Sequence, residues 1–207
     1  MARRLPMDDK YYDALLHVKT SGGQKGFSPS VHYHRYEPTP YEGLDALFLH
    51  YQLKETDRVV DFGCGKGRLL FYIHHHFGAS VVGIEIDKSL YHEAVENRVR
   101  YFKKSGYQKG EIEIHHCAAQ DYKINSLDNR FYFFNPFSIQ VFKHTLSNIL
   151  RSYEQNPRHI EIILYYGSNE YTYFVETNTP FQMKKEIIIP ELFEKNTYER
   201  FLVYQLD

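Results

Sequence analysis

The chain has 207 residues and a formal net charge of −1, so its length suits one domain with a sizeable core. The near-zero charge argues against a dedicated nucleic-acid or membrane-surface binder, because no global basic field would recruit an anionic partner. Two cysteines are too few for a disulfide framework, and residues 1–6 lack a secretory apolar region, so we expect a cytoplasmic protein without a membrane span.

Residues 1–57 precede the first strand signal, and we expect them to form an N-terminal helical and aromatic cap segment. A helix is expected around residues 8–19, followed by a glycine-containing loop and the aromatic segment 31–41. Apolar residues at helical spacing between Leu44 and Tyr51 indicate a second helix that leads into the first strand. We therefore expect a single domain over 1–207 with its core in 58–207.

A glycine-rich turn follows the first strand. Val59 and Val60 lead into Asp61, and glycines then stand at alternate positions: Gly63, Gly65 and Gly67. Glycine lets the backbone turn tightly and approach a ligand without a Cβ in the way. The helix expected over about 68–77 would present free N–H groups and the positive end of its dipole. This pattern predicts a ligand site at the turn.

Two nucleotide-binding fingerprints fit this turn poorly. The dinucleotide motif needs a small residue at its sixth position, where this chain has Arg68. Asp61 would also face a pyrophosphate of the same charge. The phosphate-loop motif is absent, because Gly67 is followed by Arg68 and Leu69. A ligand with a positively charged end suits Asp61 better.

The helix expected over about 68–77 ends in three histidines, His74, His75 and His76. Consecutive helical residues point in different directions and cannot converge on one ion. We therefore expect surface imidazoles near a helix end and no metal site.

The second strand, expected over 80–86, places Glu85 at its end. A carboxylate at that position can accept hydrogen bonds from both hydroxyls of a ribose. Asp87 is expected to cap the next helix, whose apolar face is expected to be formed by residues 90, 94, 95, 99 and 102.

The glycine turn and Glu85 together resemble the cofactor site of class I S-adenosylmethionine-dependent methyltransferases, whose first motif is D-x-G-x-G-x-G after the first strand. The resemblance implies that the turn, including Cys64, holds the methionine half of the cofactor. It also implies that Glu85 binds the ribose and that Ile86 packs on the adenine. The motif positions in this chain are Asp61, Gly63, Gly65 and Gly67.

The segment after the third strand, expected over 111–116, departs from that family. An acidic residue often contacts the adenine amino group there, but the corresponding positions are Ala118 and Ala119. The resemblance then leaves a backbone contact or Gln120 as the substitute, with Asp121 as the alternative.

The fourth strand, expected over 130–135, ends in Asn135-Pro136-Phe137. This is similar to the [D/N]-P-P-[Y/F] motif of amine-directed methyltransferases, with one proline missing. The resemblance implies that Asn135 and the Pro136 carbonyl orient the target nitrogen beside the cofactor, while Phe137 packs against the substrate. The alternative is a strand that ends in a proline turn with an asparagine cap.

The aromatic segment before the second helix is a candidate wall of the site. In related methyltransferases this region covers the methionine end, which would place Tyr36, Thr39 and Tyr41 around the sulfonium and the substrate. Tyrosine rings would attract a sulfonium by cation–π interaction. A surface loop with some core aromatics is the alternative. His32 and His34 are candidate proton acceptors in the same segment.

The C-terminal part predicts a helix over 139–153, a fifth strand over 160–166 and two more strands over 181–189 and 198–206. The link between the last two is too short for a crossover helix, so they should pair antiparallel. We therefore expect an α/β Rossmann-like methyltransferase fold. Its sheet has seven strands, mostly parallel, with an antiparallel C-terminal hairpin and helices on both faces.

These features together predict an S-adenosylmethionine-dependent methyltransferase that releases S-adenosylhomocysteine. The resemblance at Asn135 favours a nitrogen acceptor, and the near-neutral charge favours a small molecule or protein over nucleic acid. An NAD-dependent oxidoreductase and a non-catalytic interaction module with this fold remain the alternatives.

Overall fold

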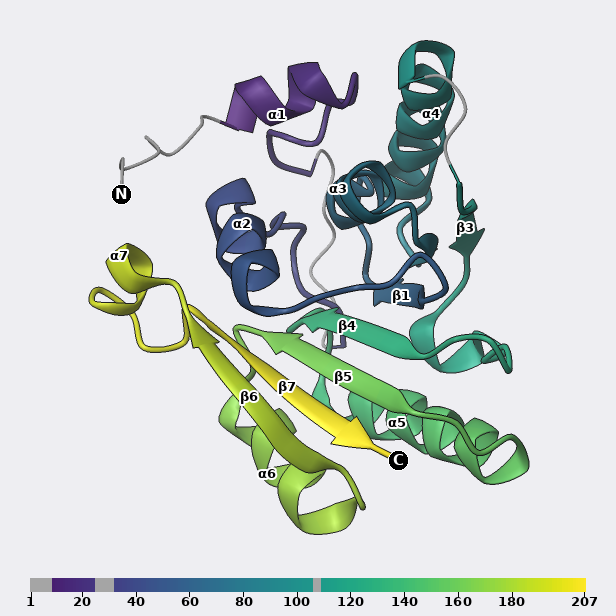
Figure 1. Cartoon of the computed structure of the whole chain (residues 1–207), viewed down its shortest axis with the longest axis vertical. Helices are drawn as coiled ribbons and strands as arrows, with labels where there is room; N and C mark the ends of the chain where they lie inside the picture. The colour runs from purple at the N-terminus through teal and green to yellow at the C-terminus, as the bar shows by residue number, and fades with distance from the viewer. Residues whose placement is uncertain (1–8, 25–31, 106–108) are drawn as a thin grey trace.

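A seven-stranded sheet runs through the computed structural model, which describes residues 9–24, 32–105 and 109–207 (Figure 1). The strands are β1 (Arg58–Phe62), β2 (Ser80–Glu85), β3 (Ile112–His116), β4 (Arg130–Phe134), β5 (Ile160–Tyr165), β6 (Gln182–Ile188) and β7 (Arg200–Leu206). Their order is β3-β2-β1-β4-β5-β7-β6, and β7 runs antiparallel to both of its neighbours while the other adjacent pairs are parallel. The predicted fold class is confirmed.

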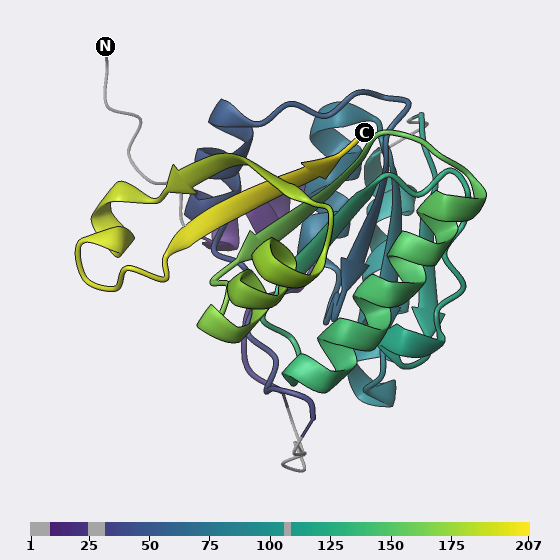
Figure 2. The ribbon, with the colours of Figure 1, turned by 90° about the horizontal axis from the view of Figure 1, so that it is seen from below.

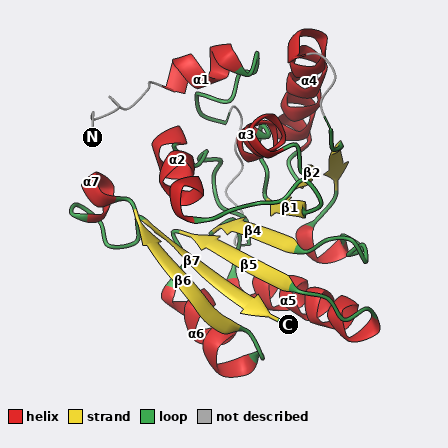
Figure 3. Cartoon of the chain, viewed as in Figure 1, coloured by secondary structure: helices red, strands yellow, loops and turns green. Residues whose placement is uncertain are grey.

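Helices cover both faces of the sheet (Figure 3). They are α1 (Asp9–Leu15), α2 (Tyr41–His50), α3 (Arg68–Phe77), α4 (Lys88–Ser105), α5 (Ile139–Gln155), α6 (Asn169–Asn178) and α7 (Pro190–Phe193), with a 3₁₀ turn over Ala119–Asp121. Helices α1 to α4 lie on one side of the sheet in Figure 1, and Figure 2 shows α5 and α6 across the other. Strand order and helix placement together make β1 and β4 the central strands, where the chain switches direction.

Alternate side chains along the strands pack into two separate hydrophobic cores, one on each face of the sheet. In β4, Tyr132 faces the core under α2 and α3, whereas Phe131 and Phe133 face the core under α5. In β1, Val59 and Val60 divide in the same way. Because successive strand residues point to opposite faces, a sheet buried on both sides reads as a continuous apolar run. This explains why the strands were visible in the sequence.

The described part of the N-terminal segment is built into the first core. Tyr12, Leu16 and Tyr41 are buried in the same cluster as α3 residues. Asn97 on α4 is fully buried and bonds the N–H and carbonyl of Lys19 at 2.8 and 3.1 Å. Residues 9–24 are therefore held against the helices that flank the glycine turn. The expectations for residues 1–8 and 25–31 fall outside the described residues.

Two expectations about the helices were wrong. Val99 and Phe102 were placed on the apolar face of α4 but are exposed, since the buried positions are Leu90, Ala94, Asn97 and Tyr101. A buried asparagine that bonds backbone groups breaks the apolar pattern, which misplaced the predicted face. The three-histidine end of α3 was expected at the surface, yet His74 is fully buried.

His74 is buried because both its ring nitrogens have partners. Its Nδ1 lies 2.9 Å from the Tyr101 hydroxyl and its Nε2 lies 3.3 Å from the carbonyl of Gly110. Buried polar groups are tolerated when they are bonded in this way. In the described parts of the chain, no three His, Cys, Asp or Glu side chains gather where they could hold a metal ion.

The sequence analysis missed α6, which connects β5 to β6. Only Tyr171 and Val175 of this helix are buried, so it carries little apolar periodicity. Its start does have a signal, because the Ser168 side chain accepts a hydrogen bond from the Tyr171 N–H. The link between β6 and β7 contains the single turn α7, and the two strands pair antiparallel as predicted. None of the helices in the described ranges has the length and apolar composition needed to cross a bilayer.

Candidate active site at the carboxyl edge of the sheet

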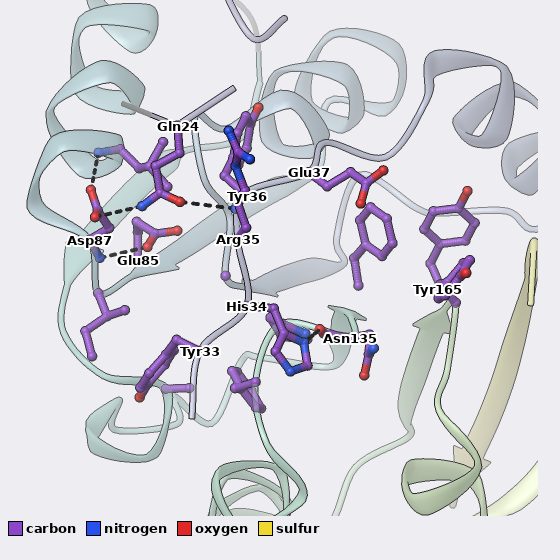
Figure 4. Close-up of a pocket in the computed structure, with 18 of the residues that line it drawn as sticks. Gln24, Tyr33, His34, Arg35, Tyr36, Glu37, Glu85, Asp87, Asn135 and Tyr165 are labelled. Carbon is purple, nitrogen blue, oxygen red and sulfur yellow. Dashed lines mark hydrogen bonds between the residues drawn. The ribbon is translucent and has the colours of Figure 1, made fainter. Parts of the chain in front are cut away.

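A cavity of about 860 Å³ opens where β1, β2, β4 and β5 end. Ligands of open α/β sheets bind at this edge, beside the switch point. Residues 33–37 and the link between α7 and β7 complete its walls. Figure 4 shows Glu85 and Asp87 on one side of the cavity and Asn135 and Tyr165 on the other. We call these two sides the Glu85 end and the Tyr165 end. The volume lies within the range of about 300–1,000 Å³ that is usual for small-molecule pockets.

The glycine turn is fastened to β2 at the base of the cavity. The N–H groups of Gly63 and Cys64 both donate to the Ile84 carbonyl, at 2.9 and 3.1 Å. Gly63 lines the cavity, and Cys64 is buried beneath it. Gly67 lines neither cavity at this edge and forms the N-cap of α3 with a φ of 85°. The turn is thus a rigid floor rather than a loose loop.

Gly65 has a steric requirement of its own. Its φ is +54°, and a Cβ on this residue would lie 2.1 Å from the ring of Tyr36. The Tyr36 hydroxyl donates to the Thr20 carbonyl at 2.8 Å, and the Lys66 ammonium lies 5.4 Å from the centre of the ring. Tyr36 lines the cavity. The structure therefore brings Tyr36 directly onto the glycine turn.

Glu85 is held in position by two backbone donors. The N–H of Gly65 reaches its Oε2 and the N–H of Asp87 its Oε1, both at 2.8 Å. Burial raises the pKa of Glu85, and these N–H groups oppose that rise. An ionised carboxylate has about four acceptor positions, so two remain for hydroxyl groups of a ligand. Asp87 also accepts from the Leu90 N–H at 2.9 Å, which confirms its predicted cap role.

Gln24 connects the N-terminal segment to this end of the cavity. Its Nε2 donates to Asp87 Oδ2 at 2.9 Å, and its Oε1 accepts from the Tyr36 N–H at 3.2 Å. Gln24 is buried and lines the cavity. No sequence pattern identified it, because its partner lies 63 positions further along the chain.

Asp61 lies below the glycine turn and borders a second, smaller pocket together with Thr39 and Arg68. Burial, reinforced by the nearby charge of Glu85, raises the pKa of Asp61 to about 8. Arg68 pairs with Asp9 at 2.8 Å instead, and Asp61 forms no ion pair within the described ranges. A buried carboxylate in this situation favours a cationic partner.

Thr39 and Tyr41 take different places. The Thr39 hydroxyl lies 2.7 Å from the Tyr132 hydroxyl, and the Thr39 carbonyl accepts from Arg68 at 3.2 Å. Thr39 thus borders the small pocket beside Asp61. Tyr41 is fully buried in the core, where its hydroxyl donates to Asp13 at 2.9 Å, and it lines neither pocket.

The segment before Tyr36 pairs with the end of β4. Tyr33 and Phe137 form an antiparallel bridge, and the His34 N–H donates to the Pro136 carbonyl at 3.1 Å. His34 Nδ1 lies 2.7 Å from the Asn135 carbonyl. Because a carbonyl only accepts, this nitrogen carries the proton in neutral His34, and Nε2 is left as an acceptor. The ring lies beside Asn135 in the middle of the cavity (Figure 4).

Asn135, Pro136 and Phe137 all line the cavity. Asn135 has a φ of 38°, an unusual conformation for a residue other than glycine. The Pro136 carbonyl accepts one hydrogen bond from His34 and retains a second lone pair. Phe137 is nearly completely buried, so its ring contributes mainly to the wall.

The residues expected near an adenine lie partly at the Glu85 end. Ile86 is 40% exposed and lines the cavity, as does Ala119. Ala118 and Gln120 do not line it, and Gln120 Oε1 instead accepts from the Tyr33 hydroxyl at 3.2 Å. Asp121, the alternative, does not line it either.

The Tyr165 end contains residues that the sequence analysis did not select. We call this region the Tyr165 bay. Tyr165 ends β5 and Tyr166 follows it, and strand-end placement is the signal that could have found them. The bay is lined by Glu37, Phe134, Tyr165, Tyr166, Asn196 and Glu199.

Part of this chain matches a known protein family. Residues 59–155 match the family described as a methyltransferase domain. A histone-lysine N-methyltransferase specific for lysine 79 of H3, from Dictyostelium discoideum, is 32% identical over 74 residues. That stretch is 33% of this chain and only 4% of the relative, so the chain covers a small part of that protein.

Solved structures share the fold at low identity. An RNA methyltransferase from Salinibacter ruber, in complex with S-adenosyl-L-homocysteine, is 21% identical with a TM-score of 0.56, over 82% of this chain and 92% of that one. A S-adenosylmethionine-dependent methyltransferase from Aquifex aeolicus is 15% identical with a TM-score of 0.58, over 83% and 94%. A putative RNA methyltransferase from Pyrococcus horikoshii is 17% identical with a TM-score of 0.57, over 96% and 97%.

Proposed function

We propose that the chain is a class I S-adenosylmethionine-dependent methyltransferase and that it methylates a nitrogen atom of its acceptor. The observation that carries the proposal is the single cavity that joins Glu85 and the glycine turn to Asn135 and Pro136. Donor and acceptor can therefore meet without crossing bulk water, which is what a group transfer requires.

The Glu85 end fits the donor. Two bonded carboxylate oxygens with free acceptor positions suit ribose hydroxyls, and exposed Ile86 suits the face of an adenine. The carboxylate of Asp61 suits the positively charged methionine end. We assign Asp61, Gly63 and Gly65 to the methionine end of the cofactor, with Thr39 and Tyr36 covering it. Cys64 and Gly67 shape the turn, and Ala119 contributes backbone rather than side chain.

When bound, S-adenosylmethionine supplies an activated methyl group on a sulfonium. The protein must position the nucleophile, exclude water and accept a proton. Asn135 and the second lone pair of the Pro136 carbonyl orient the acceptor nitrogen through its N–H groups. His34 Nε2, the free acceptor of a ring fixed by Asn135, takes the proton.

The class of acceptor is inferred from the charge of the chain. A formal net charge of −1 favours a small molecule or a protein side chain over a polynucleotide. The RNA and histone substrates named for similar proteins remain properties of those proteins. No feature of the described residues favours an oxidoreductase, and the family match argues against it.

We also propose that residues 1–207 form one domain in which the described residues of the N-terminal segment 1–57 serve as the cap over the cofactor. Tyr36, Gln24 and Arg68 support this role, because each ties the N-terminal segment to the glycine turn or to β2. A cytoplasmic location remains a prediction from cysteine usage. Cys64 and Cys117 are free thiols, and fractionation of cells that express the protein tests the location.

Isothermal titration with S-adenosylhomocysteine tests the proposed function. We expect the wild-type protein to bind it and Asp61→Ala to lose about 100-fold or more in affinity, because an interaction with a buried charge is removed. Glu154→Ala, on the exposed face of α5, is the control and should bind like the wild type. Binding of NADH without binding of S-adenosylhomocysteine would contradict the proposal.

A further inference from the structure

We propose that the Tyr165 bay selects a cationic alkylamine, either a free amine or a lysine side chain, as the methyl acceptor. The inference rests on the proposed methyltransferase function and names the substrate class of the same site. It is carried by the charge and the aromatic content of the bay, which differ from those of the Glu85 end.

Two carboxylates give the bay its charge. Glu37 and Glu199 both line it, and Figure 4 shows Glu37 on the same side of the cavity as Tyr165. Two nearby cations point elsewhere. A Cβ on Gly23 would lie 3.3 Å from the Arg35 guanidinium, which places that group away from the bay, and Arg200 pairs with Glu186 at 2.8 Å. The bay therefore has acidic charge that a bound cation would complement.

Aromatic rings form the remaining walls. The ring centres of Phe134 and Tyr165 lie 4.5 Å apart, and those of Phe134 and Tyr166 lie 6.3 Å apart. Tyr198 does not line the cavity but packs against Tyr166, with 5.4 Å between the two ring centres. Aromatic faces around a carboxylate-lined space attract ammonium groups through cation–π interaction, and a neutral alcohol gains nothing comparable.

The bay is held in a defined shape. The Tyr165 hydroxyl donates to the Glu199 carboxylate, and the Asn196 amide donates to the Tyr166 hydroxyl at 2.6 Å. Tyr166 has a φ of 52°, which is strained for a bulky residue. Backbone strain of this kind is tolerated where the surroundings enforce it and is concentrated at functional sites. These contacts arrange the bay before any acceptor arrives.

A cationic amine must lose a proton before it can react, and His34 stands between the bay and the Glu85 end (Figure 4). The ammonium gives its proton to His34 Nε2. The freed nitrogen lone pair then forms the N–C bond to the methyl carbon as the C–S bond breaks, and that electron pair stays on the sulfur of S-adenosylhomocysteine. Charge and atoms balance without any further reagent.

Binding of 1,5-diaminopentane to the full-length protein tests the inference, in the presence of saturating S-adenosylhomocysteine and beside 1,5-pentanediol as the neutral isostere. We expect the diamine to bind about tenfold or more tightly than the diol. Glu199→Gln keeps an oxygen that accepts from Tyr165 and removes the charge. We expect Glu199→Gln and Glu37→Gln each to weaken diamine binding about threefold to tenfold, with S-adenosylhomocysteine affinity unchanged.

Glu170→Gln, exposed on α6, is the matched control and should change neither affinity. Transfer of labelled methyl groups to the free diamine or to a peptide with one internal lysine then distinguishes the two sources of the amine. Equal binding of diamine and diol, or no diamine binding to the S-adenosylhomocysteine complex, would overturn the inference. Those results leave the proposed function standing, whereas failure to bind S-adenosylhomocysteine would refute that function itself.

Discussion

The two ends of the cavity are built in different ways. The Glu85 end is built mainly on residues 61–87, with Gln24, Tyr36 and Ala119 added from other segments, and the Glu85 carboxylate is buried and bonded to backbone N–H groups. The Tyr165 bay gathers side chains from four separate segments, between Glu37 and Glu199, and these range from the exposed Glu37 to the buried Tyr165. The first end is specified by local sequence, and the second only by the folded chain.

This difference suggests a division of labour. A donor shared by many methyltransferases can be held by a compact motif, whereas the acceptor side varies with the segments that reach it. Substitutions at the Glu85 end should therefore abolish cofactor binding, and substitutions in the Tyr165 bay should change the choice of acceptor alone.

The largest effect is expected at the centre of the glycine turn. Gly65→Val should reduce S-adenosylhomocysteine affinity about 100-fold or more, because the added side chain would meet the Tyr36 ring and strain a positive φ. Isothermal titration measures the loss. Gly22→Ala is the matched control, since its φ is +89° and nothing lies within 4 Å of an added Cβ. Equal losses in the two variants would show that backbone strain alone matters.

An intermediate effect is expected at Arg68, which joins the N-terminal segment to α3. Its guanidinium bonds Thr20 and Asp9 at 2.8 Å and packs on the Tyr41 ring. Arg68→Lys keeps the charge but loses the planar fork, so we expect about 2–4 kcal/mol of destabilisation in urea denaturation. Arg151→Lys, exposed on α5, should change stability little. A loss of stability with unchanged S-adenosylhomocysteine affinity would show that the Arg68 contacts stabilise the N-terminal segment without shaping the cofactor site.

A pH-dependent effect is expected at Asp61. Its pKa in the folded protein, about 8, lies above the unfolded value, so its contribution to stability is present at low pH and is lost as the pH rises toward 8. Each pH unit between about 4 and 8 lowers the free energy of unfolding of the wild type by roughly 1 kcal/mol through this group. Asp61→Asn should flatten that slope and make the ligand-free protein more stable at pH 7.

Urea denaturation of both proteins at several pH values measures the two slopes, with Glu154→Gln expected to follow the wild type. A steeper slope in Asp61→Asn would contradict the raised pKa. A more stable variant that no longer binds S-adenosylhomocysteine would show that stability is sacrificed at this position for ligand binding.

Sequence patterns predicted the central strands because most of their residues are apolar and buried on both faces, as in β1 and β5. They predicted Asp61 and Glu85 as site candidates because both stand directly at strand ends. They missed α6, whose buried face is only two residues, and the burial of His74, which depends on Tyr101 across the fold. Strand-end placement could have pointed to Tyr165, but the rest of the bay was not predicted, because its residues share no sequence spacing and meet only in the folded chain.

The central claim is that one cavity holds the donor at the Glu85 end and presents its methyl group to Asn135. A crystal structure of the complex with S-adenosylhomocysteine tests this most directly. The account predicts both ribose hydroxyls within hydrogen-bond distance of Glu85 and the sulfur facing the side of Asn135 and His34. An empty cavity, or a nucleoside seated in the Tyr165 bay, would contradict it.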